Sequence, residues 1–75
     1  DPENTDTIIF AGLNYAANDH LDKAFGLLRK ALVIEIAGKN IEKSRIIVRV
    51  IQSIGAFDLL SKKDLAFIKK EIKNF

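Results

Sequence analysis

Few side chains in this sequence could do chemistry, and its one histidine is the first to consider. His20 stands between Asp19 and Asp22, and an imidazole placed to exchange protons is the usual general base of an enzyme. A general base also needs a nucleophile or a substrate within hydrogen-bond reach. The sequence shows no such partner, so we interpret His20 as a solvated residue in the first turn of a helix.

The other candidates for catalysis or metal binding are equally isolated. The chain has no cysteine and a single histidine, which excludes thiolate chemistry and the thiolate or histidine clusters that hold structural metals. Ser44, Ser53 and Ser61 stand in no nucleophile motif, and no glycine-rich loop is present that would bind phosphate. We therefore expect no enzyme activity, no cofactor and no metal.

Glu35 is the one carboxylate that falls among apolar residues. A helical projection places it within an arc formed by Leu21, Phe25, Leu28 and Leu32. A carboxylate buried there without a partner would be costly. Two interpretations follow: Glu35 marks a functional position, or the helix ends before it, and we expect the second.

Basic residues form another class of candidate. Arg45 and Arg49 lie one helical turn apart and could contact phosphates. Further phosphate contacts could come from Lys62, Lys63, Lys69 and Lys70. Glu42 shares the arginine stripe and would pair with Arg45 on a helix surface, and the net charge is only +2. Nucleic-acid binding therefore stays the alternative hypothesis.

Charge is unevenly divided along the chain. Residues 1–37 carry a net charge of −3, whereas residues 38–75 carry +5. Such asymmetry favours head-to-tail association or an acidic partner, although two solvated faces would also produce it.

Start and stop signals predict four helices joined by short loops. A first helix is capped within residues 4–6 and runs to about Ala17. A second is capped by Asp19 and runs to about Ile36, with Gly38 just past its end. Short loops between such helices make neighbours antiparallel.

The second half of the chain continues the pattern. Asn40 caps a third helix that closes at Gly55, and Ser61 with Asp64 forms a capping box before a fourth helix near 65–72. The docked stripe of that fourth helix is Leu65, Ile68, Ile72 and Phe75. We expect a single all-α domain over residues 1–75, a compact four-helix antiparallel arrangement with a flexible acidic stretch at residues 1–5.

The third predicted helix has an unusually wide apolar face. Its apolar residues cover an arc about twice the ordinary stripe of roughly 100°; they are Ile41, Ile46, Ile47, Val48, Val50, Ile51 and Ile54. Only Lys43 and Ser44 interrupt this arc, so we expect a central helix buried on two sides. A β-hairpin of residues 32–36 and 45–51 is the rival, but it would place arginines and isoleucines on one face.

The first two predicted helices, over residues 8–35, resemble one tetratricopeptide-repeat hairpin. The repeat pattern is W-x2-L-G-x2-Y followed by A-x3-F. The matching positions here are Ile8, Ala11, Gly12 and Tyr15, then Ala24, Leu28 and Ala31. The chain departs from the pattern at Ile8, Ala11 and Leu28, and no proline follows. The resemblance implies a protein- or peptide-binding module whose groove positions would be Asp6, Ile9, Leu13 and Ala16.

These patterns together indicate a non-enzymatic protein–protein interaction module. We expect a cytoplasmic dimerisation, adaptor or small regulatory protein, a homodimer that buries an apolar helix face against a partner helix. The contact residues would be Ile9, Leu13, Ile46, Val50 and Ile54, each of which could instead belong to the core of its own chain. No apolar run approaches the roughly 20 residues that span a bilayer, so we expect no membrane-spanning helix.

Overall fold

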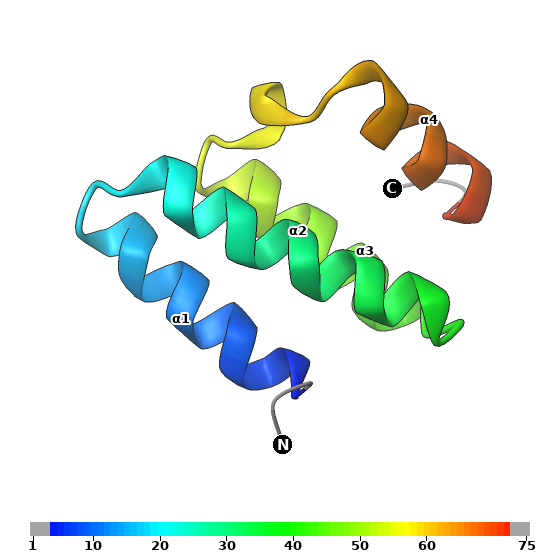
Figure 1. Cartoon of the computed structure of the whole chain (residues 1–75), viewed down its shortest axis with the longest axis horizontal. Helices are drawn as coiled ribbons and strands as arrows, with labels where there is room; N and C mark the ends of the chain where they lie inside the picture. The colour runs from blue at the N-terminus through cyan, green and yellow to red at the C-terminus, as the bar shows by residue number, and fades with distance from the viewer. Residues whose placement is uncertain (1–3, 73–75) are drawn as a thin grey trace.

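A computed structural model describes residues 4–72, which form helices, turns and connecting segments without a strand (Figure 1). The elements are α1 (Thr5–Ala17), α2 (Leu21–Ala37), α3 (Ile41–Ser53), a short 3-10 helix η1 (Phe57–Leu59) and α4 (Lys62–Glu71). The all-α arrangement of four helices is confirmed. The rival hairpin is wrong, because residues 32–36 and 45–51 are both helical.

The central element is α2, which corrects the expectation that the third helix is central. In Figure 1, α1, α2 and α3 run in alternating directions, and α1 and α4 lie on either side of α2. α2 packs against both α1 and α3. Its fully buried residues include the small Ala24 and Ala31 beside the larger Leu28, which allows neighbouring helices to pack closely.

The buried face of α3 differs from the predicted one. Ile47 and Ile51 are fully buried, but so is Ser44, whereas Ile46 is 56% exposed. The Ser44 hydroxyl donates to the backbone carbonyl oxygen of Asn40 at 2.7 Å, and this bond satisfies it inside the core. A serine can therefore take a core position, and α3 is rotated so that Ile46 faces solvent.

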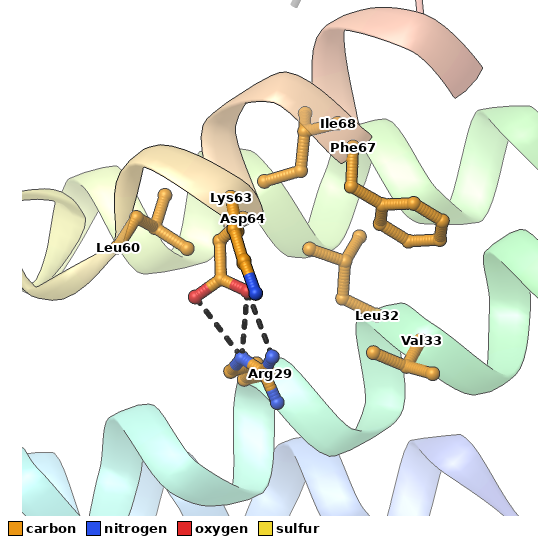
Figure 2. A pocket seen from close by; sticks show the side chains of 8 residues that line it. All are labelled: Arg29, Leu32, Val33, Leu60, Lys63, Asp64, Phe67 and Ile68. Atoms are coloured by element: carbon orange, nitrogen blue, oxygen red, sulfur yellow. Dashed lines mark hydrogen bonds and ion pairs between the residues drawn. The ribbon is translucent and has the colours of Figure 1, made fainter.

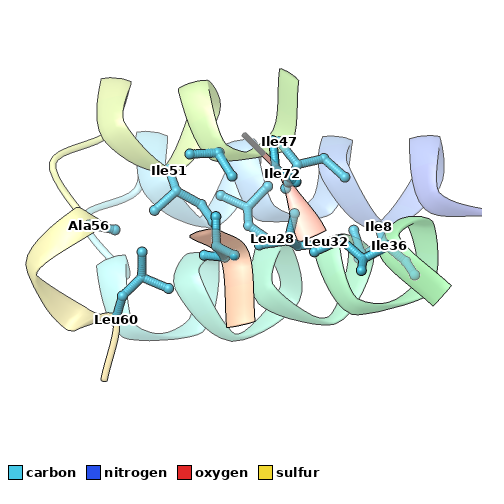
Figure 3. Close-up of a cluster of buried hydrophobic side chains, with 12 residues drawn as sticks. Ile8, Leu28, Leu32, Ile36, Ile47, Ile51, Ala56, Leu60 and Ile72 are labelled. Atoms are coloured by element: carbon cyan, nitrogen blue, oxygen red, sulfur yellow. The ribbon is translucent and has the colours of Figure 1, made fainter. Parts of the chain in front are cut away.

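One hydrophobic cluster joins all four helices (Figure 3). It contains Ile8, Leu28, Ala31, Leu32, Ile36, Ile47, Val48, Ile51, Ala56, Leu60, Ile68 and Ile72. Ile68 and Ile72 dock the C-terminal helix against this core, and each such side chain contributes roughly 1.5–3 kcal/mol when fully buried. Phe75, expected in the same stripe, lies outside the described residues.

The first three helices end in the same way. A residue with positive φ follows each of them, at 61°, 62° and 79°: Asp19, Lys39 and Gly55. The next backbone N–H then donates to the carbonyl oxygen five residues back, at 2.9, 3.0 and 3.0 Å, which is the closing bond of a Schellman motif. The left-handed position after α2 is thus Lys39, one residue beyond Gly38.

Asp19 does not cap α2 as predicted, because its left-handed backbone serves the end of α1. His20 is the N-cap residue instead, and its side chain makes no capping hydrogen bond. The capping box of Ser61 and Asp64 is confirmed, but the helix it opens starts at Lys62. That helix therefore begins three residues earlier than expected.

The start of α1 is also better ordered than the sequence suggests. Asn4 is its N-cap and accepts hydrogen bonds from the backbone N–H groups of Asp6 and Thr7. Thr5, expected in a flexible stretch, is the first residue of α1 and is only 5% exposed. Residues 1–3 of that stretch lie outside the described residues. No helix within residues 4–72 is long and apolar enough to cross a membrane.

Candidate protein-interaction site

A groove of about 270 Å³ lies between α2 and α4 (Figure 2). Its floor consists of buried core residues, Leu32, Leu60 and Ile68. Val33 on α2 and Phe67 on α4 stand at its rim, and each is 42% exposed. Apolar side chains thus line a surface depression that no other part of residues 4–72 covers.

An ion pair between α2 and α4 closes one side of this groove. The Nη2 of Arg29 lies 2.7 Å from Asp64 Oδ1, and its Nε lies 3.1 Å from both carboxylate oxygens. These hydrogen bonds from Arg29 hold the pKa of Asp64 below its usual range. Asp64 also accepts the backbone N–H of Ser61 at 3.3 Å. One carboxylate therefore both caps α4 and pairs with α2 at one side of the groove.

Lys63 gives the groove its remaining charge. It lines the opening beside Phe67 and is exposed, whereas the charge of Arg29 is offset by Asp64. The groove thus combines an apolar floor and rim with one cation that has no ion-pair partner among residues 4–72.

A second apolar surface lies on α1. Phe10 is 68% exposed, the largest exposed fraction among the bulky apolar side chains within residues 4–72, and Leu13 is exposed as well. Both lie on a stripe that begins at Asp6 and ends at Ala17, with spacings of three and four residues. We call the residues Asp6, Phe10, Leu13 and Ala17 the α1 stripe.

The five predicted contact residues do not share one environment. Leu13 and Ile46 are exposed, as an interaction residue should be. Ile9, Val50 and Ile54 are partly buried and pack against the core, which matches the alternative that we left open for them. The sequence reasoning missed Val33 and Phe67. Both could have been recognised from the sequence, because each is a large apolar residue outside the buried stripe of its own helix.

The predicted cations are mostly at the surface. Arg49, Lys62, Lys63, Lys69 and Lys70 are exposed, and Arg45 is partly buried. Lys63 is the one among them that lines the groove.

Glu35 has partners from two other helices, and the expectation that α2 ends before it is wrong, since α2 continues to Ala37. Its Oε2 accepts a hydrogen bond from Thr5 Oγ1 at 2.8 Å and lies 3.3 Å from Lys43 Nζ. The same Nζ lies 2.8 Å from Asp6 Oδ1. The hydrogen bond to Asp6, followed by that to Glu35, raises the pKa of Lys43. The Glu35 carboxylate is thus part of a polar contact that joins α1, α2 and α3.

His20 is exposed, as expected. Its ring meets that of Tyr15 edge to face, with the ring centroids 6.1 Å apart. The shallow hollow around it is lined by Ala11, Asn14, Tyr15, Asn18 and His20, and this set contains no carboxylate to orient the imidazole. Within residues 4–72, no group of His, Asp or Glu side chains is arranged to hold a metal ion.

Comparisons with known proteins leave the site to be interpreted from its own geometry. No family model matches the chain, and no curated protein and no solved structure matches it either.

Proposed function

We propose that this chain is a protein–protein interaction module that takes an amphipathic helix into the groove between α2 and α4. The observation that carries the proposal is the pair of exposed apolar side chains, Val33 and Phe67, above a floor of buried apolar residues. Grooves of this kind bind helices through apolar residues spaced three and four positions apart.

The groove has the parts that such recognition needs. Phe67 supplies a large apolar area, and covering it contributes about 25 cal/mol for each Å² removed from water. Lys63 supplies a cation at the rim, which favours acidic residues on the partner. The buried Ile68 and Ile72 dock α4 on the core before binding, which lowers the ordering cost of association.

The α1–α2 hairpin supports a relationship to the tetratricopeptide-repeat family. Gly12 lies against Leu28 and Ala24, which is the close approach of small residues that the resemblance requires. A repeat of this kind buries its hydrophobic face by stacking on neighbouring helices, and α3 packs against α2 in a comparable way. This relationship is part of the proposal and would place the chain among peptide-binding modules.

A designed peptide tests the proposal without knowledge of the natural partner. The probe is an acidic amphipathic helix with leucine at positions i, i+3 and i+7 and glutamate elsewhere, titrated into isotope-labelled protein. We expect amide chemical-shift changes around Leu32, Val33 and Phe67, and binding at least about tenfold weaker for Phe67→Ser, a loss of roughly 1.4 kcal/mol. Ile46→Ser removes an equally exposed apolar side chain outside the groove and should bind normally. Shifts that are absent, or equal in both variants, would exclude the groove.

Nucleic-acid binding is the second candidate, and the exposed cations of α4 favour it: Lys62, Lys63, Lys69 and Lys70. A surface of this kind binds phosphates without sequence preference, and its affinity falls steeply with salt. A gel shift with mixed DNA at low salt that disappears on adding salt would support this function. The absence of a shift at low salt would dismiss it.

A further inference from the structure

The groove between α2 and α4 has a fitting occupant in the chain itself, the exposed stripe of α1. We propose that α1 of a second copy binds in this groove, so that the protein associates head to tail. This inference rests on the proposed function, because it names the partner of the same groove. Three observations carry it: the spacing of apolar residues on α1, the distribution of charge, and the positions of the two surfaces in the fold.

The α1 stripe has the residue spacing of a groove-binding helix. Phe10 and Leu13 are three positions apart and Ala17 follows four positions later, all of them exposed. This is the i, i+3, i+7 pattern by which amphipathic helices lie in apolar grooves. Phe10 is the anchor, since more than half of its surface would otherwise remain in water.

Charge complements this fit. α1 carries one carboxylate, Asp6, and no lysine or arginine, so its net charge is −1. The Asp6 side chain pairs with Lys43 but stays 64% exposed. The two helices that form the groove have a net charge of +3, from seven cations and four carboxylates: Lys23, Arg29, Lys30, Lys62, Lys63, Lys69 and Lys70 against Asp22, Glu35, Asp64 and Glu71. A helix with a net charge of −1 is attracted to a groove whose helices carry +3, whereas two α1 helices packed together gain no such attraction. The charges therefore favour contact of α1 with the groove over contact of α1 with another α1.

The two surfaces cannot meet within one molecule. α1 and α4 lie on either side of α2 (Figure 1), and the groove is lined by no residue of α1. A contact between two different surfaces is heterologous, and it continues from copy to copy until a ring closes or a chain of copies forms. We therefore expect oligomers larger than a dimer to form as the protein concentration rises.

Mixing two variants tests this arrangement. Phe10→Asp removes the α1 anchor, and Phe67→Asp removes the groove rim; both residues are exposed, and circular dichroism melts check that both variants fold. Sedimentation is followed from about 10 µM to about 1 mM, where weak interfaces assemble. We expect the natural sequence to exceed twice its monomer mass of 8.4 kDa, and each variant alone to remain monomeric. The mixture should form a one-to-one dimer and stop there, because each variant keeps one intact surface.

Ile46→Asp is the matched control, since Ile46 is exposed but belongs to neither surface; its association should be unchanged. Leu13→Asp and Val33→Asp provide a second pair if either first variant fails to fold. A monomeric natural sequence, a mixture that stays monomeric, or a loss of association in Ile46→Asp would overturn the head-to-tail contact. If the designed acidic peptide still bound the groove in that case, the proposed function would stand while this inference failed.

Discussion

Thr5 Oγ1 donates a 2.8 Å hydrogen bond to Glu35 Oε2 and so joins the first turn of α1 to the last turns of α2. The two residues are 30 positions apart in the sequence. Lys43 Nζ approaches the same oxygen from α3 at 3.3 Å. A carboxylate that looked misplaced among apolar residues thus has a hydroxyl and an ammonium partner, and it fixes three helices relative to one another.

Thr5→Val tests what this hydrogen bond contributes. Valine keeps the shape of the buried side chain but leaves Glu35 without its hydroxyl donor, and a hydrogen bond to a charged group is worth about 1.5–3 kcal/mol. We expect a loss of that order in the free energy of unfolding, measured by urea denaturation at neutral pH. Thr7→Val is the control, because Thr7 is exposed in the same helix and should change stability by less than about 0.5 kcal/mol. Equal effects of the two substitutions would contradict the role of Glu35 as acceptor.

Two helical glycines should respond in opposite ways to alanine. A Cβ at Gly26 would meet nothing within 4 Å, so Gly26→Ala should stabilise the protein by about 0.5–1 kcal/mol through helix propensity. A Cβ at Gly12 would lie 3.1 Å from Leu28 Cγ and 3.4 Å from the Ala24 carbonyl oxygen. Because Leu28 is fully buried and has little room to move, Gly12→Ala should lose that gain or destabilise the protein. Thermal denaturation of both variants measures these changes in stability. Equal stabilisation by the two substitutions would show that α1 and α2 are not in close contact at Gly12.

The left-handed residues at the helix ends offer a route to higher stability. Asp19 and Lys39 adopt φ values of 61° and 62°, which cost residues with a Cβ roughly 1–2 kcal/mol, less for aspartate. Lys39→Gly should therefore raise the free energy of unfolding by about 1 kcal/mol and Asp19→Gly by somewhat less. Gly55→Ala places a Cβ at a residue with a φ of 79°. This opposite substitution should lower the free energy of unfolding by about 1 kcal/mol. If glycine at position 39 lowered the melting temperature, the Schellman ending of α2 would be wrong.

The ion pair between Arg29 and Asp64 predicts a dependence of stability on acid pH. The folded-state pKa of Asp64 is lowered, chiefly by its hydrogen bonds from Arg29. The contribution of ionised Asp64 to the free energy of unfolding is therefore complete above the unfolded-state pKa of about 3.9. It is lost as pH falls through the lower folded-state pKa. Because the pair lies at the surface, that contribution should be at most about 1 kcal/mol.

Urea denaturation of the natural sequence and of Asp64→Asn measures this effect. The natural sequence should have a higher free energy of unfolding than Asp64→Asn at neutral pH. This difference should disappear at acid pH. Asp58→Asn, at an exposed carboxylate, should show no comparable gap. A gap that persisted well below the folded-state pKa would mean that the pairing of charges is not its cause.

Local signals were enough to predict much of the fold. The cap Asn40 and the capping box of Ser61 lie where the sequence indicated, and the cap of α1 falls within the expected residues 4–6, because capping needs only a side chain and the backbone N–H groups two or three residues on. Hydrophobic periodicity gave four helices for the same reason, since it depends on residues within a few turns of one another. The position of Asp19 was misjudged because the end of α1 required the same residue in a left-handed conformation.

Tertiary packing decided what local signals could not reach. The burial of Ser44, the exposure of Ile46 and the partners of Glu35 all depend on how one helix rotates against others distant in the sequence. The groove between α2 and α4 likewise depends on packing, because its floor brings Leu32 of α2 together with Leu60 and Ile68, which are distant in the sequence. The sequence by itself therefore determined the helices and the composition of their faces. The three-dimensional packing alone decided which apolar side chains remain in water, because burial depends on all the neighbours a side chain meets and not on its own helix.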